Sequence, residues 1–189
     1  MRKVILFIHT SLDGYISGPN GEMDWIIYDE ALQSYASDLH STVDTVLYGR
    51  VTYQMMAGFW PNLPESLLES KYHVEQARWL EDATKIVFSQ SLEKVEWKNS
   101  RLIKENIPEQ ISTLKQQPGN DIIIIGSGRV SHYLMQKGLI DEYRINVNPV
   151  VLGGGIPLFK DVSHRINLKL EKTIPFHTGI IGLVYQAIR

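Results

Sequence analysis

The chain has 189 residues, of which 43% are hydrophobic, and its formal net charge is −2. This length and composition predict one domain, residues 1–189, with enough apolar side chains for a sizeable core. The nearly balanced charge argues against broad nucleic-acid binding, which needs a strong positive field. Because the sequence contains no cysteine, it excludes disulfides, thiolate nucleophiles and cysteine-bound zinc.

The N-terminal segment 1–9 is basic and then apolar, like the start of a signal peptide. Its apolar part is short and runs into Asp13 and Gly14 without a small-residue cleavage site, which favours a buried first strand. No apolar stretch approaches the length of a membrane span. We therefore expect a soluble, cytoplasmic protein with no membrane partner.

Apolar runs alternate with helically spaced apolar residues along most of the chain. The runs predict strands at residues 4–9, 45–48, 85–89, 101–104, 121–125, 142–147, 168–174 and 180–188. Helices are predicted around 32–39 with Asp29 as the cap, from about 52, over 66–82, around 107–114 and over 130–137. This alternation predicts an α/β fold, in which helices cover both faces of a mostly parallel sheet. The last two strands have no helix between them, so we expect an antiparallel hairpin at one edge.

The clearest candidate site is the turn Gly126-Ser127-Gly128, which follows a buried strand and precedes a helix. A helix start offers unpaired N–H groups and a partial positive charge, and glycine lets a pyrophosphate approach the backbone. A strand-to-helix turn can also need glycine for its geometry alone, and the full GxGxxG fingerprint is missing. The turn by itself therefore leaves nucleotide binding and a purely structural role open.

A second strand-to-helix junction contains Gly49, Arg50 and Thr52. The planar guanidinium group suits a phosphate because it can donate two bonds at once, and a threonine hydroxyl can add a third. Ligands of open α/β sheets gather at the carboxyl ends of strands, so two such junctions favour a nucleotide site. Ser89, at the end of a third strand, is a further candidate, and a strand-end cap explains it equally well. A solvated arginine beside a capped helix is the alternative for Arg50.

Two loops complete the set of motifs. Asp13 lies just beyond the first strand, where a ligand would lie, although Asp-Gly is also an ordinary turn. Gly153 and Gly154, followed by Gly155, permit close backbone approach, as a wide hairpin loop also requires. The six histidines show no metal-ligand spacing, so no metal site is predicted, and His9 is interpreted as a core or pocket residue.

These four motifs, in this order, resemble the dihydrofolate reductase-like superfamily. They are most similar to the C-terminal reductase domain of riboflavin biosynthesis, the RibD C-terminal type, and its stand-alone relatives. The resemblance spans residues 4–188 and rests on the motifs at 11–14, 49–52, 125–130 and 152–159. It implies a three-layer α/β fold around a mostly parallel sheet of about eight strands. It also implies NADPH as cofactor and a homodimer, for which the apolar hairpin 168–188 is a candidate interface.

The resemblance implies hydride transfer from NADPH to a C=N or C=O carbon of a small pyrimidine- or pterin-like substrate. The model reaction is the 5-amino-6-(5-phosphoribosylamino)uracil reductase step. Arg50 would bind the 2′-phosphate. The implied cofactor residues are Gly49, Arg50, Thr52, Ser89, Gly126, Ser127, Gly128, Arg129 and Val130. The substrate-side candidates are Trp25, Trp60, Gly153 and Gly154.

Three catalytic carboxylates are possible: Asp13, Asp29 and Glu30. Dihydrofolate reductases keep a carboxylate near the start of the first helix, where both Asp29 and Glu30 fit. Asp13 or Glu30 could assist protonation if a pocket raised its pKa toward neutrality. Core packing is an alternative role for both Trp25 and Trp60.

The chain also departs from the family pattern. A chain without cysteine has nothing comparable to the zinc deaminase domain of the bifunctional riboflavin enzyme. The segment 53–56 replaces an acidic, proline-containing stretch, which puts the riboflavin substrate itself in question. Ser127 stands where dihydrofolate reductases have the second glycine of a cis bond, and a cis Gly126–Ser127 bond, costing about 2.5–4 kcal/mol, stays open. True dihydrofolate reduction and a non-catalytic nucleotide-binding or assembly module are the alternative functions.

Overall fold

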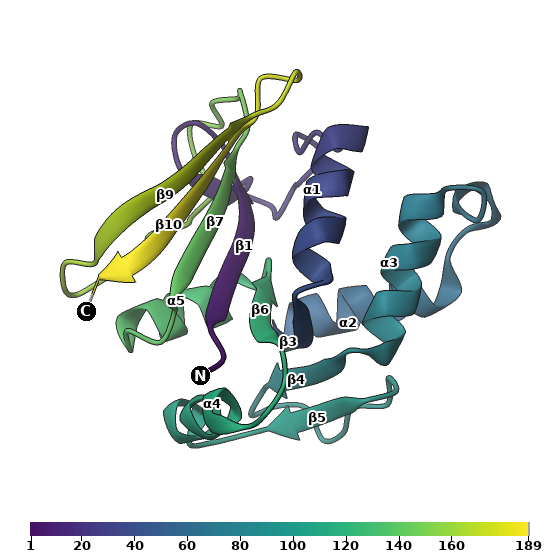
Figure 1. Cartoon of the computed structure of the whole chain (residues 1–189), viewed down its shortest axis with the longest axis vertical. Coiled ribbons are helices and arrows are strands. Elements are labelled where there is room, and N and C mark those ends of the chain that lie inside the picture. The colour runs from purple at the N-terminus through teal and green to yellow at the C-terminus, as the bar shows by residue number, and fades with distance from the viewer. Residues whose placement is uncertain (189) are drawn as a thin grey trace.

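The computed structural model describes residues 1–188, which contain an eight-stranded sheet in the order β5-β4-β3-β6-β1-β7-β10-β9 (Figure 1). Its strands are β1 (Val4–Thr10), β3 (Val43–Gly49), β4 (Thr84–Phe88), β5 (Ser100–Ile103), β6 (Asp121–Ile125), β7 (Glu142–Val147), β9 (Asn167–Pro175) and β10 (Ile181–Ile188). A second, two-stranded sheet pairs β2 (Tyr15–Ser17) with β8 (Ile156–Pro157). The helices are α1 (Glu30–His40), α2 (Arg50–Phe59), α3 (Lys71–Asp82), α4 (Ile107–Gln116) and α5 (Gly128–Gln136), with 3₁₀ turns at Trp60–Asn62 and Glu65–Leu67.

The pairing of the strands confirms the predicted topology. Strands β5, β4, β3, β6, β1 and β7 run parallel, whereas β10 is antiparallel to both β7 and β9. Every residue of β1 is buried, as expected for a strand covered on both faces. Strand β9 is mostly exposed and forms one edge of the sheet.

Two hydrophobic cores lie on opposite faces of the sheet, because alternate side chains of a strand point to opposite sides. Ile5 and Phe7 of β1 belong to the core formed with α1, α2 and α3, whereas Leu6 and Ile8 belong to the core formed with α4 and α5. Figure 1 shows these two groups of helices on either side of the sheet. The predicted three-layer α/β architecture is therefore confirmed.

Three predicted helix starts differ from the structure, one of them that of α5, which begins at Gly128 rather than at residue 130. Helix α2 begins at Arg50, two residues before the predicted start, because Gly49 has the extended backbone of an N-cap. The predicted helix 66–82 is instead a short 3₁₀ turn followed by α3, which starts afresh where Ser70 caps it by accepting a hydrogen bond from the His73 amide. Asp29 is confirmed as the cap of α1, since its Oδ1 accepts from Leu32 N at 2.7 Å.

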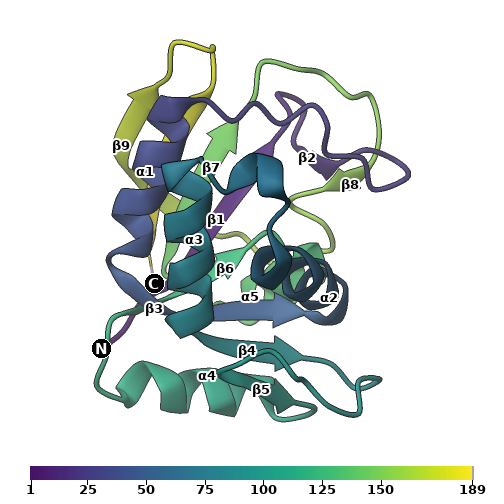
Figure 2. The ribbon, with the colours of Figure 1, turned by 90° about the vertical axis from the view of Figure 1, so that its right-hand side faces the viewer.

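The parallel strands direct their carboxyl ends to one edge of the sheet. In Figure 2 the arrowheads of β3 and β4 point toward the side where β2 and β8 lie. We call this the carboxyl edge and the opposite one the amino edge. All four sequence motifs follow or adjoin strands at the carboxyl edge, so this edge positions the candidate site. Within residues 1–188, no helix is long and apolar enough to cross a membrane.

Candidate functional site

The β3–α2 and β6–α5 junctions are joined by one hydrogen bond. The Gly49 amide donates to Ser127 Oγ at 2.7 Å, between residues that are 78 positions apart in the sequence. Strands β3 and β6 are neighbours in the sheet, so the starts of α2 and α5 lie side by side. A Cβ on residue 49 would lie 3.1 Å from Ser127 Oγ and 3.3 Å from Val130 Cγ2, so glycine permits this close approach. We call this region the paired junction.

The glycine-rich turn adopts an unusual backbone conformation. Gly126 has φ of 61° and Ser127, the cap of α5, has φ of 55°, both in the left-handed region. No peptide bond within residues 1–188 is cis, so the Gly126–Ser127 bond is trans. Ser127 is buried, whereas a Cβ added to Gly126 would meet no atom within 4 Å. The turn therefore leaves open space beside its backbone at Gly126.

Two arginines flank the paired junction. Arg50 is the first residue of α2 and Arg129 the second of α5, and both side chains are exposed. Neither has an ion pair or a side-chain hydrogen bond with the other residues that the structure describes. Two helix starts add unpaired N–H groups and partial positive charge at the same place. This arrangement can bind a phosphate group.

Thr52 and Ser89 lie near the paired junction. Thr52 is half-buried in the first turn of α2. Ser89 directly follows β4, whose Phe88 is in register with Gly49. Its Oγ accepts hydrogen bonds from the amides of Ser91 at 3.2 Å and Leu92 at 3.1 Å. Ser89 therefore caps the turn after β4, as its structural interpretation predicts.

Asp13 holds the glycine loop in place. Its carboxylate accepts hydrogen bonds from the amides of Leu152 at 3.1 Å and Gly153 at 2.8 Å. The Ser11 hydroxyl first, and then these amides, hold the pKa of Asp13 below its usual value. Asp13 would act as a proton donor near neutral pH only with a raised pKa, and its pKa is lowered instead. Gly155, with φ of 132°, passes so close to the end of β2 that a Cβ would lie 2.0 Å from Ser17 O.

Buried polar side chains, among them those of His9 and Asn148, lie at the ends of β1 and β7. Asn148 Nδ2 donates to Thr10 O at 3.3 Å and Asn146 O at 3.1 Å, and lies 3.5 Å from His9 Nδ1. Its Oδ1 accepts from the Ile27 amide at 3.3 Å, which ties the segment before α1 to the sheet. Burial lowers the pKa of His9 to about 4, so the ring is neutral at pH 7.

The two predicted aromatic candidates on the substrate side, Trp25 and Trp60, lie in different segments, and Tyr28 is a further aromatic residue near the first of them in the chain. Tyr28, next to Asp29, places its ring 5.1 Å from that of His9, centroid to centroid. Trp25 is half-buried, and its indole N–H donates to Glu22 O at 3.1 Å. Trp60 directly follows the last residue of α2 and is therefore about 15 Å along the helix from Arg50.

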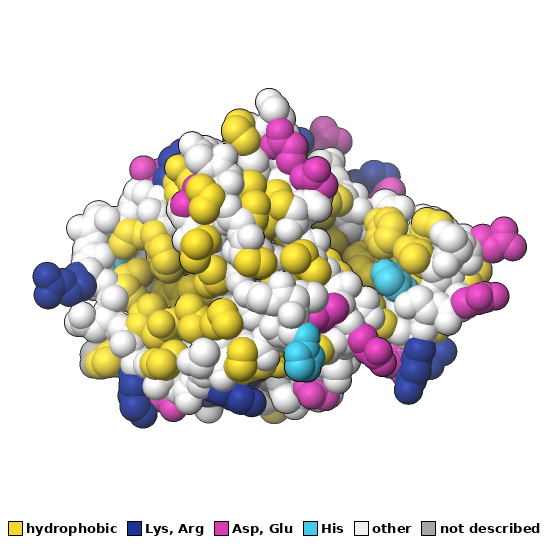
Figure 3. Space-filling model, turned by 90° about the horizontal axis from the view of Figure 1, so that it is seen from above, with side chains coloured by type: hydrophobic (Ala, Val, Ile, Leu, Met, Phe, Trp, Pro, Cys, Tyr) yellow, Lys and Arg dark blue, Asp and Glu magenta, His cyan; other side chains and the backbone are white. Residues whose placement is uncertain are grey.

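The Trp60 ring packs against side chains at the start of α3. The Trp60 ring stacks on that of His73 with 6.2 Å between centroids, and Tyr72 contacts the same histidine at 5.4 Å. Figure 3, which views the molecule from above Figure 1, shows hydrophobic side chains gathered in hollowed areas of this face. Charged side chains lie mainly around the rim. Glu30 is exposed at the first position of α1.

Sequence reasoning missed Tyr28, Asn146 and Asn148. The signal was present, because one asparagine near the end of β7 and another just after it interrupt an apolar segment. Their meaning depends on register, since His9 is paired with Asn146 across β1 and β7. Only that pairing shows that three polar side chains meet at one place.

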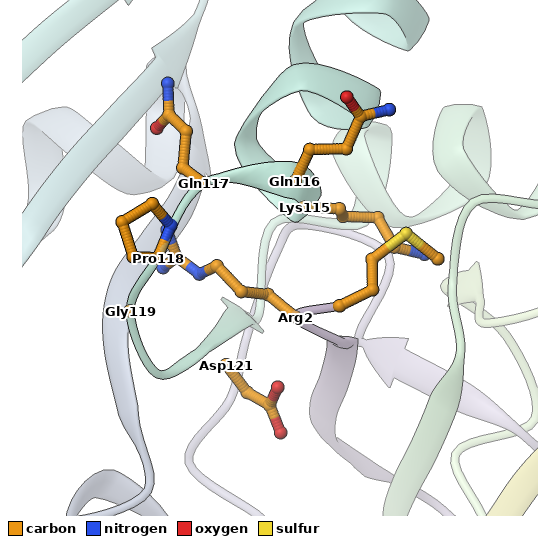
Figure 4. Close-up of a pocket in the computed structure, with 8 residues that line it drawn as sticks. Arg2, Lys115, Gln116, Gln117, Pro118, Gly119 and Asp121 are labelled. Atoms are coloured by element: carbon orange, nitrogen blue, oxygen red, sulfur yellow. The ribbon is translucent and has the colours of Figure 1, made fainter.

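A separate hollow of about 460 Å³ lies at the amino edge, around Arg2, Lys115 and Asp121 (Figure 4). Arg2 already binds Asp44, Thr45 and the carbonyl of Asn120, and Lys115 binds Asp141 at 2.7 Å. These pairs serve the fold, so this hollow is not a candidate active site. Within residues 1–188, no group of three or more His, Cys, Asp or Glu side chains is arranged to hold a metal ion.

Comparison with known proteins agrees with the fold and the motifs. The architecture is that of the dihydrofolate reductase-like α/β proteins. The chain belongs to the RibD C-terminal domain family, whose model matches residues 2–181. It is 36% identical over 185 residues to the uncharacterized protein YyaP of Bacillus subtilis, covering 98% of this chain and 95% of that protein.

Solved structures give the same result. A Shewanella sp. PV-4 protein described as a riboflavin biosynthesis protein superposes with a TM-score of 0.78 and 26% identity, over 99% of both chains. Dihydrofolate reductase from Enterococcus faecalis, in complex with NADP(H), superposes with a TM-score of 0.63 and 14% identity, over 99% of this chain and 97% of that one. The predicted family and fold are both confirmed.

Proposed function

We propose that this chain is an NADPH-dependent reductase whose cofactor phosphates bind at the paired junction. The observation that carries the proposal is the Gly49–Ser127 hydrogen bond, which brings together two helix starts with the exposed side chains of Arg50 and Arg129. Membership of the RibD C-terminal domain family supports a reductase. The shared fold with a dihydrofolate reductase that binds NADP(H) supports the choice of cofactor.

The residues of the junction fit this cofactor. Open space beside Gly126 admits a pyrophosphate close to the backbone N–H groups of the turn and of α5. Arg50 would hold the 2′-phosphate and Arg129 a second phosphate, since neither has an acidic partner in residues 1–188. Thr52 and Ser89 lie beside these groups and would contribute hydroxyls. When bound, NADPH supplies a hydride to the substrate carbon and leaves as NADP⁺.

We propose that the substrate is a small planar heterocycle bound between the ends of β1 and β7 and the start of α1. In this proposal Tyr28, whose ring lies beside that of His9, contacts the bound ring together with Trp25 of the same segment, and the reducible bond would be C=N or C=O. A proton must reach the nitrogen or oxygen of that bond, and Asp29 and Glu30 are the acids nearest to Tyr28 in the chain. The substitution Asp29→Asn tests the acid alone, because asparagine is also a good helix cap.

Titration with the two nicotinamide cofactors tests the phosphate site. We expect Arg50→Ala to weaken NADPH by 10- to 100-fold and NADH only slightly, because a charge-assisted bidentate contact is worth about 1.5–3 kcal/mol. Arg129→Ala should weaken both cofactors. The matched control is Arg78→Ala, an exposed arginine in the middle of α3. Equal losses for both cofactors in Arg50→Ala, or the same loss in the control, would contradict the proposal.

Turnover then separates the alternatives. NADPH oxidation over pyrimidines, pterins and small carbonyl compounds identifies a reductase. Binding of NADPH without turnover on any of them would favour a nucleotide-binding module. Reduction of dihydrofolate together with tight binding of methotrexate would instead identify dihydrofolate reductase activity.

A further inference from the structure

Two buried polar side chains at the ends of β1 and β7 lack hydrogen-bond partners among the described residues. They are His9, at its Nε2, and Asn146, at both its amide atoms. His9 is 7% exposed and Asn146 is fully buried. The two residues are in register on neighbouring strands, so their side chains share the face that carries Phe7 and packs against α1.

Unsatisfied buried groups of this kind are costly. Each costs about 1–3 kcal/mol when no partner is present, and most buried polar atoms in native proteins are paired. Two adjacent residues therefore indicate that polar atoms from outside the chain complete the pairing. The position, at the carboxyl ends of two central strands, is where ligands bind in open α/β sheets.

Asn148 determines which nitrogen of His9 carries the proton. Its amide orientation is fixed by the backbone, since Nδ2 donates to Thr10 O and Asn146 O while Oδ1 accepts from the Ile27 amide. Nδ2 is a donor only and faces the His9 Nδ1 at 3.5 Å, so a proton on Nδ1 would point at another donor. The neutral ring then carries its proton on Nε2. The unpartnered atom of His9 is therefore a hydrogen-bond donor that needs an acceptor.

Tyr28 lies beside the His9 ring at the surface of the molecule. Its ring contacts that of His9 at 5.1 Å, and Tyr28 itself is 53% exposed. A side chain that is half exposed can rotate aside or stack on an incoming ring without disturbing the core. The segment that carries it is anchored to the sheet by Asn148, through the Ile27 amide. A planar ligand can therefore approach His9 from the side of α1.

We infer that His9 and Asn146 determine substrate specificity by holding the polar edge of a ring that carries a carbonyl next to an N–H. His9 Nε2–H donates to the carbonyl oxygen, and the Asn146 amide pairs with the neighbouring N–H. Asn148 is a positioning residue that fixes the His9 tautomer. The inference rests on the proposed reductase function for the role of the bound ring, and it selects oxo rings over amino rings.

The test uses 1-methyluracil and 1-methylcytosine, called uracil and cytosine below, because the methyl group removes the N1–H and leaves them different at the edge formed by positions 3 and 4. Uracil offers a carbonyl next to an N–H there, whereas cytosine offers an amino group next to a bare ring nitrogen. Binding is followed by NMR in the presence of NADP⁺, with the ¹⁵N signal of His9 Nε2 as the local reporter. We expect uracil to shift that signal in the wild-type protein and cytosine to bind at least tenfold more weakly.

Two variants at His9 isolate the donor. His9→Phe keeps the ring shape and leaves Asn148 Nδ2 with its two carbonyl acceptors, so it should be at least as stable as the wild type. It should bind uracil at least tenfold more weakly with unchanged NADPH affinity. His9→Gln, whose amide can place an N–H near the Nε2 position, should recover part of the loss. His164→Phe, at an exposed histidine, is the matched control.

The outcomes separate this inference from the proposed function. Equal binding of uracil to wild type and His9→Phe would overturn it, as would equal binding of cytosine and uracil. Failure of uracil to bind or to shift the His9 signal would also overturn it, and an internal water would then be the partner. Any of these results with intact NADPH binding leaves the reductase proposal standing. Failure of the wild-type protein to bind NADPH defeats the reductase proposal instead.

Discussion

The two edges of the parallel sheet hold their basic side chains in opposite situations. At the amino edge, Arg2 binds Asp44 and Lys115 binds Asp141. At the carboxyl edge, Arg50 and Arg129 are exposed and have no ion pair within residues 1–188. A basic side chain with an internal partner stabilises the fold, whereas one without a partner is available to an anion. The comparison predicts that substitutions at the amino edge change stability and that those at the carboxyl edge change binding.

The largest expected effect is a loss of stability in acid, because each edge carries one buried histidine. Burial lowers the pKa of His9, at the carboxyl edge, and of His40, just before β3, to about 4. The unfolded chain takes up these protons near pH 6.5, whereas the folded chain resists until about pH 4. The free energy of unfolding therefore has its full value above pH 6.5 and falls by roughly 3 kcal/mol per histidine as the pH drops to 4. Urea unfolding at pH 7.0, 5.5 and 4.0 measures the loss.

Single variants divide that loss between the edges. His9→Phe and His40→Phe should each flatten the pH dependence by about half of the histidine contribution. A ligand bound at His9 should reduce the part of the acid-induced loss of stability that His9 causes. The part that His40 causes should stay unchanged. An unaltered pH dependence in both variants would show that other groups cause the acid sensitivity.

Lys115→Met should cost about 3 kcal/mol, because it removes the cation of a buried ion pair at the amino edge. NADPH affinity should not change. The control is Lys169→Met, which removes an exposed pair with Glu171 and should cost less than about 1 kcal/mol. Chemical denaturation measures both variants. A Lys115→Met protein of normal stability would break the contrast between the two edges.

Ser127→Ala should have a smaller effect on stability, about 1–2 kcal/mol, because the Gly49 amide loses its acceptor. It should also weaken NADPH several-fold, since the two helix starts are no longer joined. Ser112→Ala, at an exposed serine on α4, is the control and should change neither property. Loss of stability without any loss of NADPH affinity would separate the junction from cofactor binding.

The smallest effect on the fold is expected at the lateral edge, where β9 ends the sheet. We propose that this edge, with Leu170 of β9 49% and the adjoining Ile188 of β10 56% exposed, pairs with a second copy of the chain. Leu170→Glu should shift the mass measured by light scattering toward the monomer while the unfolding free energy of the monomer changes by less than about 0.5 kcal/mol. A wild-type protein that is already monomeric at micromolar concentration would contradict the homodimer.

Local patterns predicted much of this molecule. Continuous apolar runs identified the strands of the sheet, and helical spacing identified the helices between them. The missing helix between residues 174 and 180 identified the antiparallel hairpin. The predictions failed at helix boundaries, where a single cap decides the outcome. Ser70, inside an apparently continuous helical pattern, restarts the chain as α3.

The sequence by itself determined the layered α/β fold, the family and the motifs at the strand ends, because each depends on residues that are close in the chain. Only the tertiary structure decided which groups meet. The Gly49–Ser127 bond, the meeting of His9 with Asn146 and Asn148, and the loop-holding role of Asp13 join residues 78 or more positions apart. Such contacts depend on strand order and register, which local composition does not encode. The same order leaves Arg50 and Arg129 without partners among residues 1–188, which supports the proposal that a ligand binds at the carboxyl edge rather than at the amino edge.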